Sequence, residues 1–150
     1  MILLSFDGSE SARHAIASAH ELLGDVSATV LHVWDPPVSY MPGDPFGGLQ
    51  AWSPSQVVEL ESAIAIRAGK VLDEGVALAT AAGFAAEGRL ERTIVAPWRA
   101  ILDVAEELDA QVIVAGARGL STVGSVVLGG VSNALVHHAK RPVLVVPTLS

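Results

Sequence analysis

Five glycines lie close together between Val112 and Ser132, and this stretch is where the sequence most clearly suggests chemistry. They follow an apolar run and precede a helix-like pattern. Glycine permits backbone angles that a side chain would forbid. A turn ahead of a helix also exposes main-chain N–H groups near the positive end of the helix dipole. The stretch therefore indicates an anion site with phosphate as the expected ligand, and an ordinary strand-to-helix loop is the alternative. The glycines are Gly116, Gly119, Gly124, Gly129 and Gly130.

Composition sets the class of protein. The chain has 150 residues, which predicts one domain spanning residues 1–150. Its 51% hydrophobic and 17% charged residues supply a sizeable core and exclude global disorder. A net charge of −7 without a basic cluster argues against nucleic acid as a partner. Cysteine is absent, which excludes disulfides and thiolate chemistry.

The sequence also bears on location. The start of the chain runs from ILLSF directly into charged residues and has no signal-peptide pattern. The most apolar long window, Thr122 to Ala139, is broken by Gly, Ser, Asn and His and is short for a membrane span. We therefore expect a cytoplasmic protein that does not interact with membranes.

The elements that must position the glycines alternate between strand and helix. Apolar or β-branched runs predict strands at residues 2–6, 27–33, 84–95, 111–115 and 143–146. Helical spacing predicts helices after Ser9, from Pro54 to Gly83, after Pro97, and through Val127, Leu128, Val131 and Leu135. Ser53, Pro54 and Gln56 have the pattern of a capping box. The alternation predicts one five-stranded parallel sheet with helices on both faces.

A long segment from Trp34 to Ser53 interrupts this pattern. It is rich in proline and glycine and holds four of the seven aromatic residues, Trp34, Tyr40, Phe46 and Trp52. Long loops in compact domains are often functional. One interpretation is a lid or partner surface, and the other is a flap that packs its aromatics on its own domain.

Three separate stretches should meet at one place. In an open parallel sheet, ligands bind beyond the carboxyl ends of the strands at the point where strand order reverses. Asp7 follows the first strand, Val33 ends the second, and Gly116 follows the fourth. We expect these residues to line one crevice.

The chain resembles the universal stress protein family over nearly its whole length. The resemblance rests on ILLSFDGSESA, TVLHVWD, VSNALVHHAKRPVLVVP and the spacing G-x2-G-x9-G, met by Gly116, Gly119 and Gly129. It implies a Rossmann-like, adenine nucleotide alpha hydrolase-like fold with strand order 3-2-1-4-5. It also implies a stress-response sensor or partner-binding module that binds ATP or AMP, and a homodimer formed through the edge strands Val143–Val146, with a protein partner still unknown.

The resemblance implies specific contacts at the nucleotide. The glycine loop would cradle the phosphates and ribose, the backbone at Val33 would meet the adenine, and Asp7 would accept from a hydroxyl or bind Mg²⁺ through the nucleotide. Arg118 either pairs with a phosphate or points to solvent. The full set of expected contacts is Ser5, Phe6, Asp7, Val33, Ala115, Gly116, Arg118, Gly119, Gly129, Gly130, Val131 and Ser132.

One position departs from the family pattern. Ser or Thr normally follows the third glycine, and here that residue is Gly130. Loss of one neutral hydrogen bond costs about 0.5–1.5 kcal/mol, which predicts nucleotide binding weakened by roughly tenfold. Ser132 is expected to compensate in part. A family member that works by protein contacts alone is the alternative.

Other functional classes lack their motifs. No G-x4-G-K-[ST] sequence exists, and no G-x-G-x-x-G follows the first strand. The histidines show no metal-site spacing, and His32 is expected to be a packed core residue. Asp7 is the single candidate base at the crevice, so no catalytic residue is predicted and slow ATP hydrolysis remains a further alternative.

Overall fold

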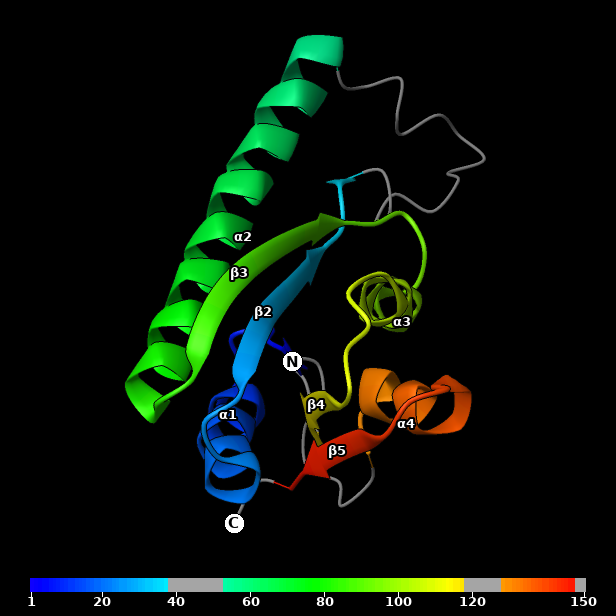
Figure 1. Ribbon diagram of the computed structural model, residues 1–150. Coiled ribbons are helices and arrows are strands. Elements are labelled where there is room, and N and C mark those ends of the chain that lie inside the picture. The colour runs from blue at the N-terminus through cyan, green and yellow to red at the C-terminus, as the bar shows by residue number, and fades with distance from the viewer. Residues whose placement is uncertain (38–52, 118–127, 148–150) are drawn as a thin grey trace.

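The computed structural model describes residues 1–37, 53–117 and 128–147, which form alternating strands and helices (Figure 1). The strands are β1 (Ile2–Ser5), β2 (Ser27–Trp34), β3 (Ala85–Arg92), β4 (Ile113–Gly116) and β5 (Val143–Val146). The helices are α1 (Glu10–Leu23), α2 (Pro54–Ala82), α3 (Pro97–Glu107) and α4 (Gly130–His138).

The strands form one parallel sheet in the order β3-β2-β1-β4-β5, which confirms the predicted architecture and strand order. From β1 the chain moves outward through β2 to β3, then returns to place β4 on the other side of β1. The order therefore reverses between β1 and β4. The register pairs Ser5 of β1 with Leu31 of β2 and Leu4 of β1 with Val114 of β4. A crevice at the carboxyl ends of these strands is the place where this topology favours a ligand.

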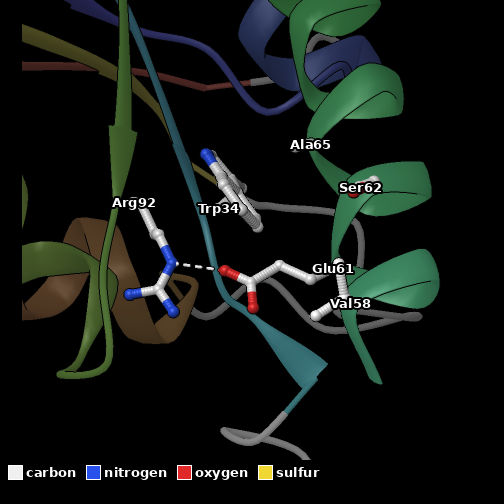
Figure 2. A pocket seen from close by; sticks show the side chains of 6 residues that line it. All are labelled: Trp34, Val58, Glu61, Ser62, Ala65 and Arg92. Carbon is white, nitrogen blue, oxygen red and sulfur yellow. Dashed lines mark hydrogen bonds and ion pairs between the residues drawn. The ribbon is translucent and has the colours of Figure 1, made fainter. Parts of the chain in front are cut away.

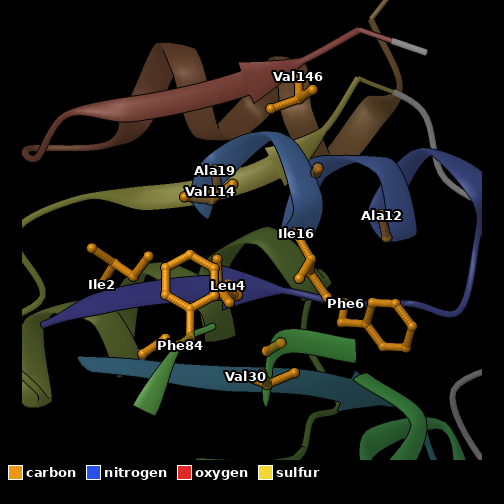
Figure 3. Close-up of a cluster of buried hydrophobic side chains, with 13 residues drawn as sticks. Ile2, Leu4, Phe6, Ala12, Ile16, Ala19, Val30, Phe84, Val114 and Val146 are labelled. Atoms are coloured by element: carbon orange, nitrogen blue, oxygen red, sulfur yellow. The ribbon is translucent and has the colours of Figure 1, made fainter. Parts of the chain in front are cut away.

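One face of the sheet packs against α1 and α2. Its core combines strand residues with small residues of the helices (Figure 3). Gly75 of α2 lies so close to the sheet that a Cβ there would be 2.6 Å from the Phe6 ring and 2.9 Å from Val30 Cγ1. Because Gly75 has no side chain, α2 can pack this closely against the sheet. The best buried members of this cluster include Ile2, Leu4, Phe6, Ala15, Ile16, Ala19 and Val30.

The opposite face packs against α3 and α4. Ile101 and Val104 of α3 and Leu135 of α4 are each 2% exposed or less, and they contact Leu3 and Ile113 of the sheet. Full burial of each such side chain contributes about 1.5–3 kcal/mol. Because both faces are covered, the central strands read as continuous apolar runs, as parallel sheets require.

Caps define where two helices begin. The Ser9 side chain accepts a hydrogen bond from Ala12 N at 3.2 Å, so Ser9 is the N-cap of α1. At α2, Ser53 Oγ accepts from Gln56 N at 3.3 Å, and Ser53 N donates to Gln56 Oε1 at 2.8 Å. This reciprocal pair confirms the predicted capping box.

Two boundaries differ by three residues from those expected, and several others differ by one or two residues. The third strand was predicted to reach Val95 but ends at Arg92, because the Thr93 hydroxyl accepts from Val95 N at 3.1 Å and turns the chain. The last helix was predicted to include Val127 and Leu128. It begins at Gly130 with Gly129 as N-cap, so Leu128 precedes it, and Val127 lies outside the described residues.

The long segment after β2 lies mostly outside the residues that the structure describes. Trp34 is the last residue of β2, whereas Tyr40, Phe46 and Trp52 lie outside the described residues. Within the ranges that the structure does describe, no helix is both long enough and apolar enough to traverse a membrane.

Candidate functional site

The end of β1 presents Asp7 at the carboxyl edge of the sheet. Phe6 is 1% exposed, and its N–H donates to Leu31 O at 2.9 Å, so it anchors the chain just before the turn. Gly8 follows with φ of 80°, a left-handed angle that favours glycine. One Asp7 carboxylate oxygen accepts from Ser9 N at 2.9 Å. The turn that leads into α1 therefore fixes the position of the Asp7 carboxylate.

Val33 of β2 has its main chain facing the space beyond β1. The β1–β2 pairing ends at Ser5 and Leu31, while β2 continues to Trp34. Leu31 O accepts from Phe6 N, directly after β1, and alternate residues of a strand point their N–H and C=O groups to the same side. The main-chain groups of Val33 therefore face the position that β1 would occupy if it continued. By register, Val33 is level with Asp7.

His32 of β2 forms a hydrogen bond to the residue that follows β1. Its Nδ1 lies 2.8 Å from Phe6 O, so this nitrogen carries the hydrogen and donates to the carbonyl. The imidazole is half-buried and was expected to be a packed core residue. Its hydrogen bond was not foreseen, because it joins residues 26 positions apart. His32 thus secures the end of β1 against β2 next to Val33.

Gly116 lies at the carboxyl end of β4. The pairing of Leu4 with Val114 places Gly116 level with Phe6, one residue beyond the end of β1. A Cβ on Gly116 would lie 2.5 Å from Ser11 Oγ and 2.6 Å from the carbonyl carbon of Ser11. The residue before it, Ala115, is also small and is 4% exposed. The end of β4 therefore touches the first turn of α1 directly.

The first turn of α4 completes the site. Gly129 is the N-cap, and no side chain caps this helix end. The amides of Gly130, Val131 and Ser132 have no acceptor within the helix, since a helix leaves its first N–H groups unpaired. Gly130 is exposed, and a Cβ there would meet no atom within 4 Å. An anion at this helix end would be stabilised by about 0.3–1 kcal/mol.

Internal hydrogen bonds occupy some groups of this region. Ala117 N donates to Val146 O at 2.8 Å, and Gly129 N donates to Ala117 O at 2.7 Å. The single hydrogen of the Ser132 hydroxyl is shared between Ala117 O at 2.9 Å and Gly129 O at 3.1 Å. Ser132 was expected to compensate in part for the donor missing at Gly130. In the structure its hydroxyl connects Ala117, which follows β4, with Gly129 at the start of α4.

The described glycines act through size rather than through backbone angle. Glycine permits backbone angles that a side chain would forbid, but Gly116, Gly129 and Gly130 do not use that freedom. They are not among the glycines with positive φ, and Gly129 has an ordinary φ of −62°. What Gly116 supplies is close approach to α1.

The site as described offers main-chain donors and one carboxylate. Such a set can bind an anion and the polar edge of a planar ligand, but it lacks a paired acid and base. In the described part of the chain, no group of three or more His, Cys, Asp or Glu residues is arranged to hold a metal ion. Three residues of the predicted turn, Arg118, Gly119 and Gly124, lie outside the described residues.

A hollow of about 320 Å³ lies beside the end of β2, and sequence reasoning missed it (Figure 2). Trp34 and Arg92 line it from the sheet, and Val58 and Glu61 line it from α2. Arg92 Nε donates to Glu61 Oε1 at 2.8 Å, and its guanidinium lies 6.0 Å from the Trp34 ring. Only the aromatic residue could have drawn attention to this surface from the sequence.

Comparison with known proteins decides the family. Residues 1–147 match the universal stress protein family. The chain belongs to this family. It is 35% identical over 147 residues to a universal stress protein of Thermus aquaticus, covering 97% of this chain and 96% of that one. It is also 30% identical to the solved structure of a family member from Burkholderia pseudomallei, with a TM-score of 0.69 and coverage of 98% and 95%.

Two further structures of the family share the fold and were solved with nucleotides. The universal stress protein of Archaeoglobus fulgidus, in complex with dAMP, is 23% identical with a TM-score of 0.58 and coverage of 96% and 94%. A family protein of Arabidopsis thaliana with AMP bound is 18% identical with a TM-score of 0.67 and coverage of 99% and 92%. At these identities the likeness shows the fold.

Proposed function

We propose that this chain binds an adenine nucleotide, ATP or AMP, at the carboxyl edge between β1 and β4, within a single domain spanning residues 1–150. One observation carries the proposal. Main-chain groups of Val33 and Gly116 flank the end of β1, and the first turn of α4 lies beside Ala117, directly after Gly116. The AMP and dAMP complexes of the fold's relatives support the choice of ligand.

The phosphate end of the ligand belongs at α4. Amides of Gly130, Val131 and Ser132 supply donors, and the helix dipole adds attraction for negative charge. Gly119 and Arg118 are proposed contacts of the same phosphates, as are Gly116 and Gly129 through their backbone. Because Gly130 brings no hydroxyl, this end relies on main-chain donors, and we propose binding weaker than a Ser or Thr at that position would give.

The base end belongs at Val33. A main chain that offers one N–H and one C=O side by side can pair with the polar edge of an adenine. Asp7 is level with Val33, and its proposed role is to accept a hydrogen bond from a ribose hydroxyl. Ser5, Phe6 and Ala115 form the floor of the proposed site through their position at the strand ends. Phe6 contributes by holding Asp7, since its side chain is buried in the core.

Mg²⁺ fits this site only together with the nucleotide. The ion is usually held by one or two carboxylates plus substrate phosphates and waters. Asp7 is the single carboxylate of the proposed set, and one of its oxygens accepts from Ser9 N. Asp7 would hold the ion, which would neutralise phosphate charge when bound.

Calorimetry tests the proposal directly. Titration of the protein with AMP and with ATP, with and without Mg²⁺, should give saturable heat and a raised unfolding midpoint. Adenine nucleotide released from the purified protein on denaturation would support it independently. No heat and no thermal shift at millimolar ligand would leave a family member that works by protein contacts alone.

We further propose that nucleotide binding changes the protein surface that a partner contacts. This would make the protein a sensor or partner-binding module in the stress response. Trp34 adjoins Val33 and lines the hollow with Arg92. Its fluorescence should therefore change when nucleotide binds. The test uses a variant with Trp52→Phe and Trp98→Phe, so that Trp34 alone reports. Unchanged emission at saturating nucleotide would contradict this mechanism.

The β5 edge supports a proposed homodimer. Val146 O accepts from Ala117 N of the chain that follows β4, so the main-chain groups of Val145 point to the outer edge. Val143, Leu144 and Val145 are half-buried and apolar, and an uncovered apolar edge invites pairing. Sedimentation should show a dimer at micromolar concentration. Val145→Pro, which removes one outward N–H, should shift it to monomer, and a monomeric wild type would refute the dimer.

A further inference from the structure

Ser132 connects the residue that follows β4, Ala117, with the N-cap of α4, Gly129. The side chain is 3% exposed, and its hydroxyl reaches the carbonyls of Ala117 and Gly129 at 2.9 and 3.1 Å. Ala117 O also accepts from Gly129 N at 2.7 Å. One carbonyl at the end of β4 therefore receives two hydrogen bonds from the start of α4.

The same point is tied to the sheet. Ala117 N donates to Val146 O at 2.8 Å, which extends the β4–β5 ladder by one residue. The Ala117 carbonyl is thus held by the sheet, and the first turn of α4 is held by that carbonyl. Bringing residues 117 and 129 together has an entropic cost that these bonds must offset. Without the hydroxyl, one hydrogen bond from a backbone amide would fix the helix start.

We propose that Ser132 is a positioning residue for phosphate recognition. Its hydroxyl fixes the first turn of α4 relative to β4, so that the amides of Gly130 and Val131 are aimed at the phosphate rather than left to vary in direction. The hydroxyl itself donates to protein carbonyls and not to the ligand. This inference rests on the proposed nucleotide site and assigns a role within it.

The inference separates phosphate-bearing ligands from the nucleoside. Ser132→Ala should weaken AMP and ATP binding by about fivefold to tenfold, the worth of one hydrogen bond, while adenosine affinity stays within twofold of wild type. In the ligand-free protein, the Gly129 amide should exchange its hydrogen faster in the variant. A hydroxyl that only donated to ligand would leave that exchange rate unchanged.

Two further variants complete the design. Ser132→Thr keeps the hydroxyl and should retain the wild-type ratio of AMP to adenosine affinity. Thr29→Val is the matched control, since Thr29 is 2% exposed and its hydroxyl donates to Glu87 Oε1 at 3.0 Å in another part of the sheet. It should lower the unfolding midpoint without changing that ratio.

The outcomes are distinct. Equal losses of adenosine and AMP affinity in Ser132→Ala, or unchanged AMP affinity, would overturn the positioning role while leaving the nucleotide site in place. A wild type that binds none of the three ligands would overturn the proposed function itself. Loss of AMP affinity with an unchanged exchange rate at Gly129 would also reject positioning and would assign the hydroxyl to the ligand.

Discussion

The carboxyl edge of the sheet is built differently on its two sides. Between β1 and β4 it consists of main chain and small residues, with Gly116 against Ser11 and an open helix start at Gly130. At β2 and β3 it consists of large side chains, with Arg92 bonded to Glu61 over the Trp34 ring. The first side lets a ligand approach the backbone closely. The second presents charge and an aromatic surface to solvent.

The largest expected effect comes from filling the close contact on the first side. Gly116→Ala places a methyl group 2.5–2.7 Å from Ser11 atoms, two of them backbone. Overpacking of this kind costs about 1–3 kcal/mol. We expect a lower unfolding midpoint in urea, together with loss of AMP binding.

Gly130→Ala is the matched control for that change. A Cβ at Gly130 meets no atom within 4 Å, and alanine has a higher helix propensity than glycine. Its stability should equal or exceed that of wild type. If Gly116→Ala and Gly130→Ala were equally destabilising, close contact with Ser11 would not be what distinguishes Gly116 from Gly130.

An intermediate effect should follow from adding a side chain where the first side has none. Gly130→Ser has room for its hydroxyl and restores the donor of the family pattern. AMP and ATP affinity should rise by about threefold to tenfold, since one hydrogen bond contributes about 0.5–1.5 kcal/mol. Calorimetry measures this change, with adenosine as the control ligand. No gain would mean that residue 130 does not face the phosphate.

A smaller effect is expected on the second side. Arg92→Ala removes the ion pair with Glu61 and the contact with Trp34, in a side chain that is 47% exposed. Exposed pairs contribute about 0–1 kcal/mol, and an exposed cation–π contact about 0.5–1 kcal/mol. Stability should fall slightly in denaturant titration, and AMP affinity should not change. A loss of AMP affinity would extend the proposed nucleotide site to this side.

The smallest effect concerns a second ion pair of β3. Arg89 donates to both carboxylate oxygens of Glu107, at 2.8 and 2.9 Å, and these hydrogen bonds lower the pKa of Glu107. A depressed pKa stabilises the folded state above the unfolded pKa of Glu107, and this contribution is lost as pH falls through the folded pKa. The difference in unfolding midpoint between wild type and Glu107→Gln should therefore shrink in acid. If the difference in unfolding midpoint stayed constant from pH 7 to pH 3, the Arg89–Glu107 pair would not contribute to pH-dependent stability.

Much of the fold could be read from local patterns. Ser9 and the capping box at Ser53 act within one helical turn, so their residues are neighbours in the sequence. The alternation of apolar strands and helices likewise fixed the fold class. Boundaries were less certain, because the end of β3 depends on the Thr93 hydroxyl and the start of α4 on Gly129 rather than on apolar spacing.

Part of the candidate site could likewise be predicted from the sequence, and part could not. The glycine spacing and the placement of Asp7 and Val33 at strand ends followed from the sequence and from the resemblance it carries. Sequence alone determined the strand-helix alternation, the caps and the absence of a side chain at Gly130, because these depend on residues a few positions apart. Tertiary structure decided that Gly116 meets Ser11, that His32 bonds Phe6, and that the Ser132 hydroxyl faces Ala117. Those contacts depend on strand register and helix packing, which bring together residues that are distant along the chain.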